Sequence, residues 1–80
     1  MSGNAVQPAA RRRIEQSELD AICARHDRLW QAKPGGARAV LASLDLSGLS
    51  LRGRNLADAD FAAANLIGAD LSGAKLDNAT

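Results

Sequence analysis

The chain has 80 residues, a net charge of +1 at neutral pH and two aromatic residues, Trp30 and Phe61. A domain of this length usually relies on aromatic side chains for buried area, so we expect a core of Leu and Ala, and no apolar run is long enough to span a membrane. Residues 1–38 hold seven Lys or Arg and four Asp or Glu, whereas residues 39–80 hold three and five, which excludes the strong single-sign field of DNA-binding or DNA-mimicking surfaces.

Residues 1–13 are small, polar and basic, with nothing to bury, and we predict a disordered arm. Arg11, Arg12 and Arg13 are not followed by an apolar stretch, so the arm is not a secretory signal. We interpret the three arginines as a solvated tail. The alternative is a contact with phosphate or with an acidic partner surface.

Residues 17–32 have helical periodicity. A single stripe contains Leu19, Ile22, Cys23, His26, Leu29 and Trp30. Ser17 followed by Asp20 resembles a capping box at the start of the helix, and Lys33-Pro34-Gly35-Gly36 ends it. An isolated helix of about this length is marginal in water, so the stripe should pack on the segment that follows. We therefore assign residues 14–38 to a capping helix and a Pro-Gly-Gly turn.

From Ala39 to the end, the sequence repeats every five residues. The repeat centres are Leu41, Leu46, Leu51, Leu56, Phe61, Leu66, Leu71 and Leu76. Two residues before the centre, the last four repeats have Ala59, Ala64, Ala69 and Ala74, whereas three of the first four repeats have larger residues at Leu44, Leu49 and Arg54. Asp or Asn often precedes the centre, and Gly often follows two residues after it. Such self-similarity indicates a repeat architecture.

A period of five fits neither a helix nor a flat strand, because the centres would rotate around the first and alternate faces on the second. It fits a chain that bends by about a right angle every five residues, so that four repeats close one coil and both apolar sites point inward. Residues 39–80 would then form two stacked coils with Leu41 under Phe61. The helix would cover the first coil and leave the last coil's edge open.

Three segments carry a resemblance to a known family: Ala59-Asp60-Phe61, Ala64-Asn65-Leu66-Ile67-Gly68 and Ala69-Asp70-Leu71-Ser72-Gly73 closely resemble pentapeptide repeats. The resemblance covers residues 39–80, and the preceding helix is similar to a segment often found before such repeats. It implies an all-β solenoid, a right-handed quadrilateral β-helix of about two coils with an N-terminal α-helical cap. It also implies protein binding and no shared catalytic residues.

Three residues raise alternatives to simple packing. Arg54 occupies an inward site, where an unpaired charge would cost several kcal/mol. Either its stem reaches solvent, or it pairs with Asp20, Asp27 or the last carbonyls of the helix. Cys23 and His26 have the spacing of two metal ligands, but a structural site usually needs four and the chain has no other Cys or His. We therefore expect both in the core, and no metal or cofactor.

The sequence predicts a non-catalytic protein–protein interaction or assembly module, docking through the open C-terminal coil edge or the outer faces. Candidate interface residues are Ile67, Leu76, Asn78 and Ala79. The open edge indicates that the chain is a fragment or that another protein, or a second copy in a homodimer, covers it. Nucleic-acid binding is disfavoured because stacking aromatics are lacking. The lone cysteine fits the reducing cytoplasm.

One alternative function comes from the family resemblance alone. Some pentapeptide repeat proteins are acidic rods that imitate DNA and regulate type II topoisomerases. A rod of two coils with a net charge of −2 is too short and too weakly charged for this, unless dimerisation extends it.

Overall fold

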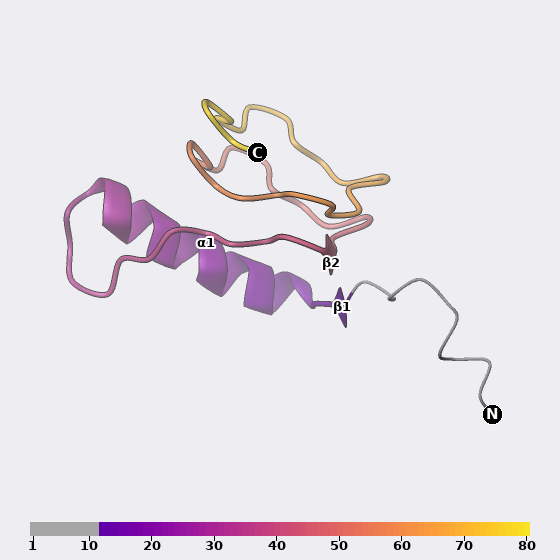
Figure 1. Ribbon diagram of the computed structural model, residues 1–80, viewed down its shortest axis with the longest axis horizontal. Coiled ribbons are helices and arrows are strands. Elements are labelled where there is room, and N and C mark those ends of the chain that lie inside the picture. Colours follow the sequence, from indigo (N-terminus) through magenta and orange to yellow (C-terminus); the bar gives the residue numbers. More distant parts are fainter. Residues whose placement is uncertain (1–11) are drawn as a thin grey trace.

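The computed structural model describes residues 12–80, in the order β1 (Arg12–Arg13), α1 (Gln16–Trp30) and β2 (Leu44–Asp45). The chain from residue 39 onward winds through two stacked coils, the first coil (residues 39–58) and the second coil (residues 59–78). Figure 1 shows α1 lying against the first coil, on the side away from the second. Within residues 12–80, no helix has the length and apolar character needed to cross a bilayer.

Main-chain hydrogen bonds join the two coils at an offset of twenty residues. Parallel bridges pair Val40 with Asp60, Asp45 with Asn65, Ser50 with Asp70, and Asn55 with Lys75. Beside the first of these bridges, the Leu41 N–H donates to the Asp60 carbonyl at 2.7 Å and the Asp60 N–H donates to the Ala39 carbonyl at 2.9 Å. Four five-residue sides per coil require this offset.

Each five-residue side ends in a tight turn. The N–H three residues after a centre donates to the centre's carbonyl, as Ala64 does to Phe61 at 2.9 Å. The residue two after every centre has a positive φ, as a type II turn requires. Glycine supplies it at Gly48, Gly53, Gly68 and Gly73, whereas Ser43, Asp58, Ala63 and Asn78 adopt φ values of 58° to 67°. Stacking therefore imposes the turn even where the residue has a Cβ.

The core consists mainly of the Leu centres. Leu41, Leu46, Leu51 and Leu56 of the first coil have no exposed area, and Phe61 is 9% exposed. Leu66 and Leu71 of the second coil are half-buried, and Leu76 is 39% exposed. The second inward site follows the same gradient: Ala59 is buried, whereas Ala64, Ala69 and Ala74 are half-buried. Burial thus decreases away from α1.

The N-terminal boundary of the fold differs from the sequence-based prediction. Arg12 and Arg13 form β1, which pairs in parallel with β2, and the next residue, Ile14, is 1% exposed. The predicted disordered arm over residues 1–13 is therefore wrong for its last two residues. Residues 1–11, including Arg11, lie outside the described part of the chain.

The ends of α1 also differ from the prediction. The N-cap is Glu15, which makes no side-chain capping bond, and Ser17 lies inside the helix, so the predicted capping box is wrong. The pairing of β1 fixes the preceding chain and starts the helix earlier. The helix ends at Trp30 because Ala32 turns left-handed at φ 55°, with the Lys33 N–H bonded to the Arg28 carbonyl at 2.9 Å.

Candidate functional site

The edge of the first coil that faces α1 is closed by contacts from the N-terminal segment. β1 pairs with one side. On the next side, the side chain of Gln16 takes the place of a strand. Its amide oxygen accepts the Ser50 N–H at 2.8 Å, and its amide nitrogen donates to the Ser50 carbonyl at 2.9 Å. The amide of this one glutamine thereby satisfies the main-chain groups that an additional strand would otherwise pair with on the side facing α1.

His26 closes the corner where the first coil begins and ends. Its Nδ1 accepts the Ala39 N–H at 2.9 Å, which places the ring proton on Nε2, 2.8 Å from the Ala57 carbonyl. The Trp30 Nε1–H lies 3.2 Å from both that carbonyl and Nε2, and it donates to the carbonyl because Nε2 already carries a proton. His26 has no exposed area, and both ring nitrogens hold main-chain groups.

The predicted apolar stripe of the helix is only partly buried. Leu19 and Cys23 lie in the core and Ile22 packs against it. Leu29 and Trp30 are 47% and 51% exposed, so the prediction that they share the buried stripe is wrong. Fifteen helical residues span about 22 Å, whereas a five-residue extended side spans roughly 16 Å, and α1 therefore overhangs the coil that it covers.

Cys23 has the environment of an inert thiol. It is 1% exposed, and burial raises its pKa, reinforced by Asp20 and Asp27 and opposed by Arg54. A raised pKa keeps the thiol protonated and unreactive at neutral pH. In the part of the chain that the structure describes, no group of three or more His, Cys, Asp or Glu residues could hold a metal ion.

Arg54 leaves its inward site and binds the helix. Its guanidinium donates to the Asp20 carboxylate at 3.1 Å, and its side chain is 30% exposed. Of the two sequence-based interpretations, pairing with Asp20 is therefore confirmed. The pair lies in an open, polar hollow of about 640 Å³ between α1 and the first coil, which Gln16 and Arg52 also line.

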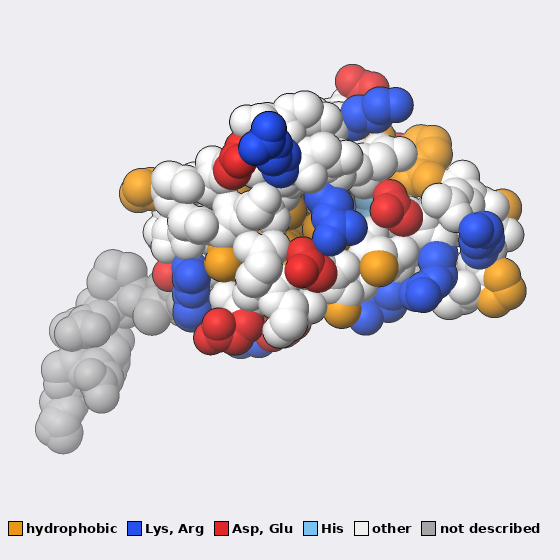
Figure 2. Space-filling model, turned by 180° about the vertical axis from the view of Figure 1, so that it is seen from behind, with side chains coloured by type: hydrophobic (Ala, Val, Ile, Leu, Met, Phe, Trp, Pro, Cys, Tyr) orange, Lys and Arg blue, Asp and Glu red, His pale blue; other side chains and the backbone are white. Residues whose placement is uncertain are grey.

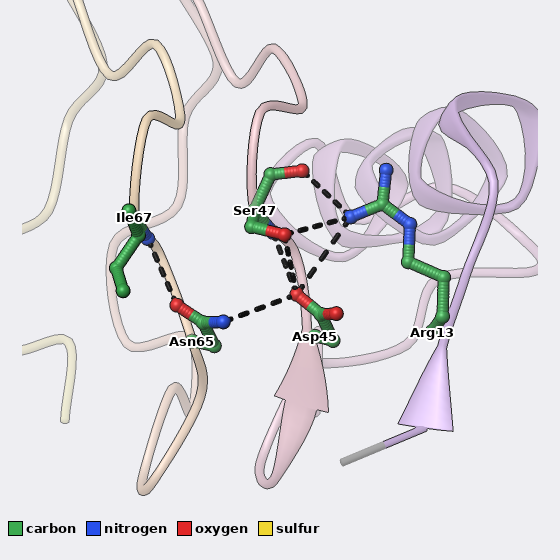
Figure 3. Close-up of polar contacts among 5 residues, drawn as sticks. All are labelled: Arg13, Asp45, Ser47, Asn65 and Ile67. Atoms are coloured by element: carbon green, nitrogen blue, oxygen red, sulfur yellow. Dashed lines mark hydrogen bonds and ion pairs between the residues drawn. The ribbon is translucent and has the colours of Figure 1, made fainter.

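Polar side chains connect three layers on the side that contains β2. Charges of both signs are scattered over the face shown in Figure 2, and Figure 3 shows a group of polar residues joined by hydrogen bonds and an ion pair. Arg13 donates to the Ser47 carbonyl at 2.6 Å and lies 3.7 Å from the Asp45 carboxylate. The Asn65 amide donates to the same carboxylate at 3.3 Å. Asp45 and Asn65, each one residue before a repeat centre, are therefore joined along the outside of the two coils.

These Asp and Asn residues have a second role that the sequence-based prediction missed. The Oδ1 of Asn65 accepts the Ile67 N–H at 3.0 Å, and Asp70 binds the Ser72 N–H at 2.9 Å in the same way. The hydroxyl and N–H of Ser72, with Arg52 nearby, lower the pKa of Asp70. The signal was available, because Asp and Asn favour side-chain bonds to the N–H two residues later.

The edge of the second coil that faces away from α1 is open. In the first coil, the N–H groups of Leu46, Leu51 and Leu56 donate to the second coil, and the carbonyls of Leu44, Leu49 and Arg54 accept from it. The equivalent groups of the second coil have no main-chain partner among residues 12–80: the N–H groups of Leu66, Leu71 and Leu76 and the carbonyls of Ala64, Ala69 and Ala74. Thr80 starts a third layer by bonding to Ala59 and Phe61 at 3.1 Å.

The predicted interface residues do not form one patch. Leu76 is partly exposed at the open edge, with the half-buried Ala79 nearby, and Asn78 supplies the positive φ of that turn. Ile67 is 78% exposed but belongs to the turn two corners away, on the opposite side of the coil. Two of the four turns of the coil separate Ile67 from the other three residues, so Ile67 belongs to an outer face and the other three to the open edge.

Comparison with known families adds the decisive observation. Residues 45–80 match the family model described as pentapeptide repeats, with eight copies. This segment belongs to the pentapeptide repeat family. Pentapeptide repeats imply a β-helix and commonly act as protein-interaction modules. The bridge between Val40 and Asp60 extends the coiled region to residues before the matched segment. No curated protein and no solved structure matches the chain.

Proposed function

We propose that this chain is a non-catalytic protein-interaction module of the cytoplasm, whose partner binds the open edge of the second coil. We also infer that its pentapeptide repeats form a right-handed quadrilateral β-helix of about two coils with an N-terminal α-helical cap. One observation carries the proposal. The N–H groups of Leu66, Leu71 and Leu76 at this edge have no main-chain partner among residues 12–80, and the leucine side chains beside them are less buried than the equivalent leucines of the first coil.

Strand addition is the binding mode that suits such an edge. An extended segment of a partner would supply carbonyls and N–H groups at the strand spacing and apolar side chains at alternate positions. The opposite edge indicates what closure requires, since β1 and Gln16 there satisfy the main chain at Asp45 and Ser50. The partner is another protein or a second copy of the chain, and the mass of the assembly distinguishes them.

The environment of the polar residues supports a role without catalysis. The carboxylates of Asp60 and Asp70 are bound to their own turns, His26 holds two main-chain groups and Cys23 is buried. His26 lines a hollow with Asp58, but main-chain groups occupy both of its ring nitrogens, so the ring has no nitrogen left to exchange a proton with a substrate.

Two matched substitutions test where the partner binds. Leu71→Arg places a charge at the open edge, and Ile67→Arg places the same charge on an outer corner of the same coil. We expect Leu71→Arg to abolish complex formation and Ile67→Arg to leave it intact. Light scattering over a range of concentrations first establishes whether a second copy binds. If the partner is another protein, a photo-crosslinking residue at Ala79 should capture it, whereas the same residue at the exposed, outward position of Ala62 should not.

Amide exchange then tests the binding mode. In the complex, the N–H groups of Leu66, Leu71 and Leu76 should exchange at least about tenfold more slowly than in the free chain. Unchanged exchange at these amides, or loss of the complex with Ile67→Arg alone, would contradict docking at the edge.

A further inference from the structure

A second surface lies at the other end of the molecule, where α1 overhangs the first coil. Leu29 and Trp30 are half exposed there, and with His26, Arg38 and Asp58 they line an open hollow of about 390 Å³. Trp30 is the only tryptophan in the chain. Apolar and basic side chains lie next to one another at this end of the molecule, on the right in Figure 2. Half-exposed Trp beside Arg is the composition that dominates binding energy at protein interfaces.

Hydrogen bonds fix the walls of the hollow before any partner arrives. The Trp30 indole N–H donates to the Ala57 carbonyl at 3.2 Å, and the Arg38 Nε donates to the Asp58 carbonyl. The terminal nitrogens of Arg38 have no hydrogen bond or ion pair among the described residues. This leaves a positioned guanidinium that can bind a carboxylate at two points. A site held in its binding geometry loses less conformational entropy on association.

The segment that supplies four of the five residues lining the hollow is basic. Exposed Arg25, Arg28, Lys33 and Arg38 lie between residues 25 and 38, against the single acid Asp27. Asp58 adds one negative charge to the lining, and the sum over these residues remains +2. The concave shape suits a protruding side chain better than a flat lipid surface. The complementary ligand is therefore acidic and carries an apolar anchor.

We propose that this hollow binds an acidic peptide segment of a partner protein. One apolar side chain of the segment inserts beside Leu29 and Trp30, and a carboxylate pairs with Arg38. This site is independent of the open edge, because it is built by α1 and the first coil rather than by the second coil.

Trp30 fluorescence measures this binding directly in the full chain. The probe is a peptide with one central Leu flanked by Glu on both sides. Two control peptides replace either the Glu residues by Lys or the Leu by Ala. We expect the first peptide to shift the emission to shorter wavelength with saturation, to bind at least about tenfold more tightly than either control, and to weaken with added salt.

Four variants locate the binding on the structure. Arg38→Gln and Leu29→Ala should each weaken the peptide by about tenfold. Lys75→Gln and Ile67→Ala remove a charge and an exposed apolar side chain elsewhere and should leave it unchanged. Leu71→Arg, which blocks the open edge, should also have no effect, so the two proposals fail separately. Circular dichroism checks each fold, and Arg38→Gln decides the matter if Leu29→Ala does not fold.

Several results would overturn the proposal. The first three are the absence of a saturable shift of Trp30 emission with the acidic peptide, an equal affinity for the Lys peptide, and control variants that weaken peptide binding as much as Arg38→Gln does. The proposal would also fail if anionic phosphatidylglycerol vesicles, and not the peptide, shifted the emission. It would fail too if light scattering showed that self-association buries Trp30.

Discussion

His26 is the buried polar residue on which closure of the first coil depends, and replacing it should be severe. In His26→Ala, the N–H of the fully buried Ala39 loses its partner, and the carbonyl of Ala57 keeps only the Trp30 indole N–H. An unsatisfied buried group costs about 1–3 kcal/mol, and the lost ring adds a cavity. We therefore expect a loss of about 3–5 kcal/mol of unfolding free energy. Proteins have only about 5–15 kcal/mol of unfolding free energy and an 80-residue chain lies near the low end of this range, so the variant should retain little stability.

Urea unfolding followed by far-ultraviolet circular dichroism measures this loss. His26→Asn is the informative companion, because its amide oxygen can take the place of Nδ1 toward Ala39 but cannot reach Ala57. It should fall between the wild type and His26→Ala. Val40→Ala removes a side chain that is 57% exposed and should change the stability by less than about 0.5 kcal/mol. A loss below about 1 kcal/mol for His26→Ala would refute the role of this side chain in closing the first coil.

Three further predictions concern the turns. Gly36→Ala should cost about 1–3 kcal/mol or more in urea unfolding, because its Cβ would lie 2.5 Å from the Leu29 nitrogen of the helix main chain; a neutral effect would contradict this close approach. Ala32→Gly should raise the free energy of unfolding by about 0.5–1 kcal/mol, and with it the melting temperature, because the left-handed φ of 55° strains a residue with a Cβ. A lower melting temperature would refute this. The lowered pKa of Asp70 gives stability that is present above the unfolded pKa and is lost as pH falls through the folded pKa. The urea midpoint should therefore fall less for Asp70→Asn than for the wild type below about pH 4, and parallel curves would exclude the Ser72 contact as the cause.

The coiled region could be predicted from sequence because the five-residue repeat period, which can be read from the local sequence, determines its geometry. A five-residue side repeated four times places Leu41 below Phe61 without any knowledge of distant contacts, and the bridge at Val40 and Asp60 has this offset. The Gly residues two after the centres indicated the turns. The pairing of Arg54 was also predictable, because a charge at an inward site must find a partner, and Asp20 is an acid on the covering helix.

The cap could not be predicted in the same way, because its contacts join residues far apart without a repeating pattern. Gln16 binds Ser50 across 34 residues, and His26 binds Ala57 across 31. Ile14 is buried like a repeat centre, yet it lies 27 residues before the first centre, Leu41, which is not a multiple of five, so the spacing of the centres gave no indication of β1. The exposure of Trp30 depends on the length of α1 relative to one side of a coil, which no local pattern encodes.

The two ends of the coils differ in a way that bears on what can bind the open one. At the capped end the inward sites hold Leu44 and Leu49, whereas the equivalent sites of the second coil are Ala64 and Ala69. A helix packs with its axis about 8–10 Å from its neighbour, and these larger side chains share the core cluster with Leu19 and Cys23 of α1, although Leu44 also lies in β2, which pairs with β1. A strand lies only about 4.7–4.9 Å away, a distance at which Ala leaves more room than Leu for the inward side chains of the added strand. The small residues at the open edge therefore favour an extended segment over a second capping helix. For the same reason, Ala69→Leu should weaken strand addition at the edge while leaving the acidic-peptide site beside Trp30 unaffected.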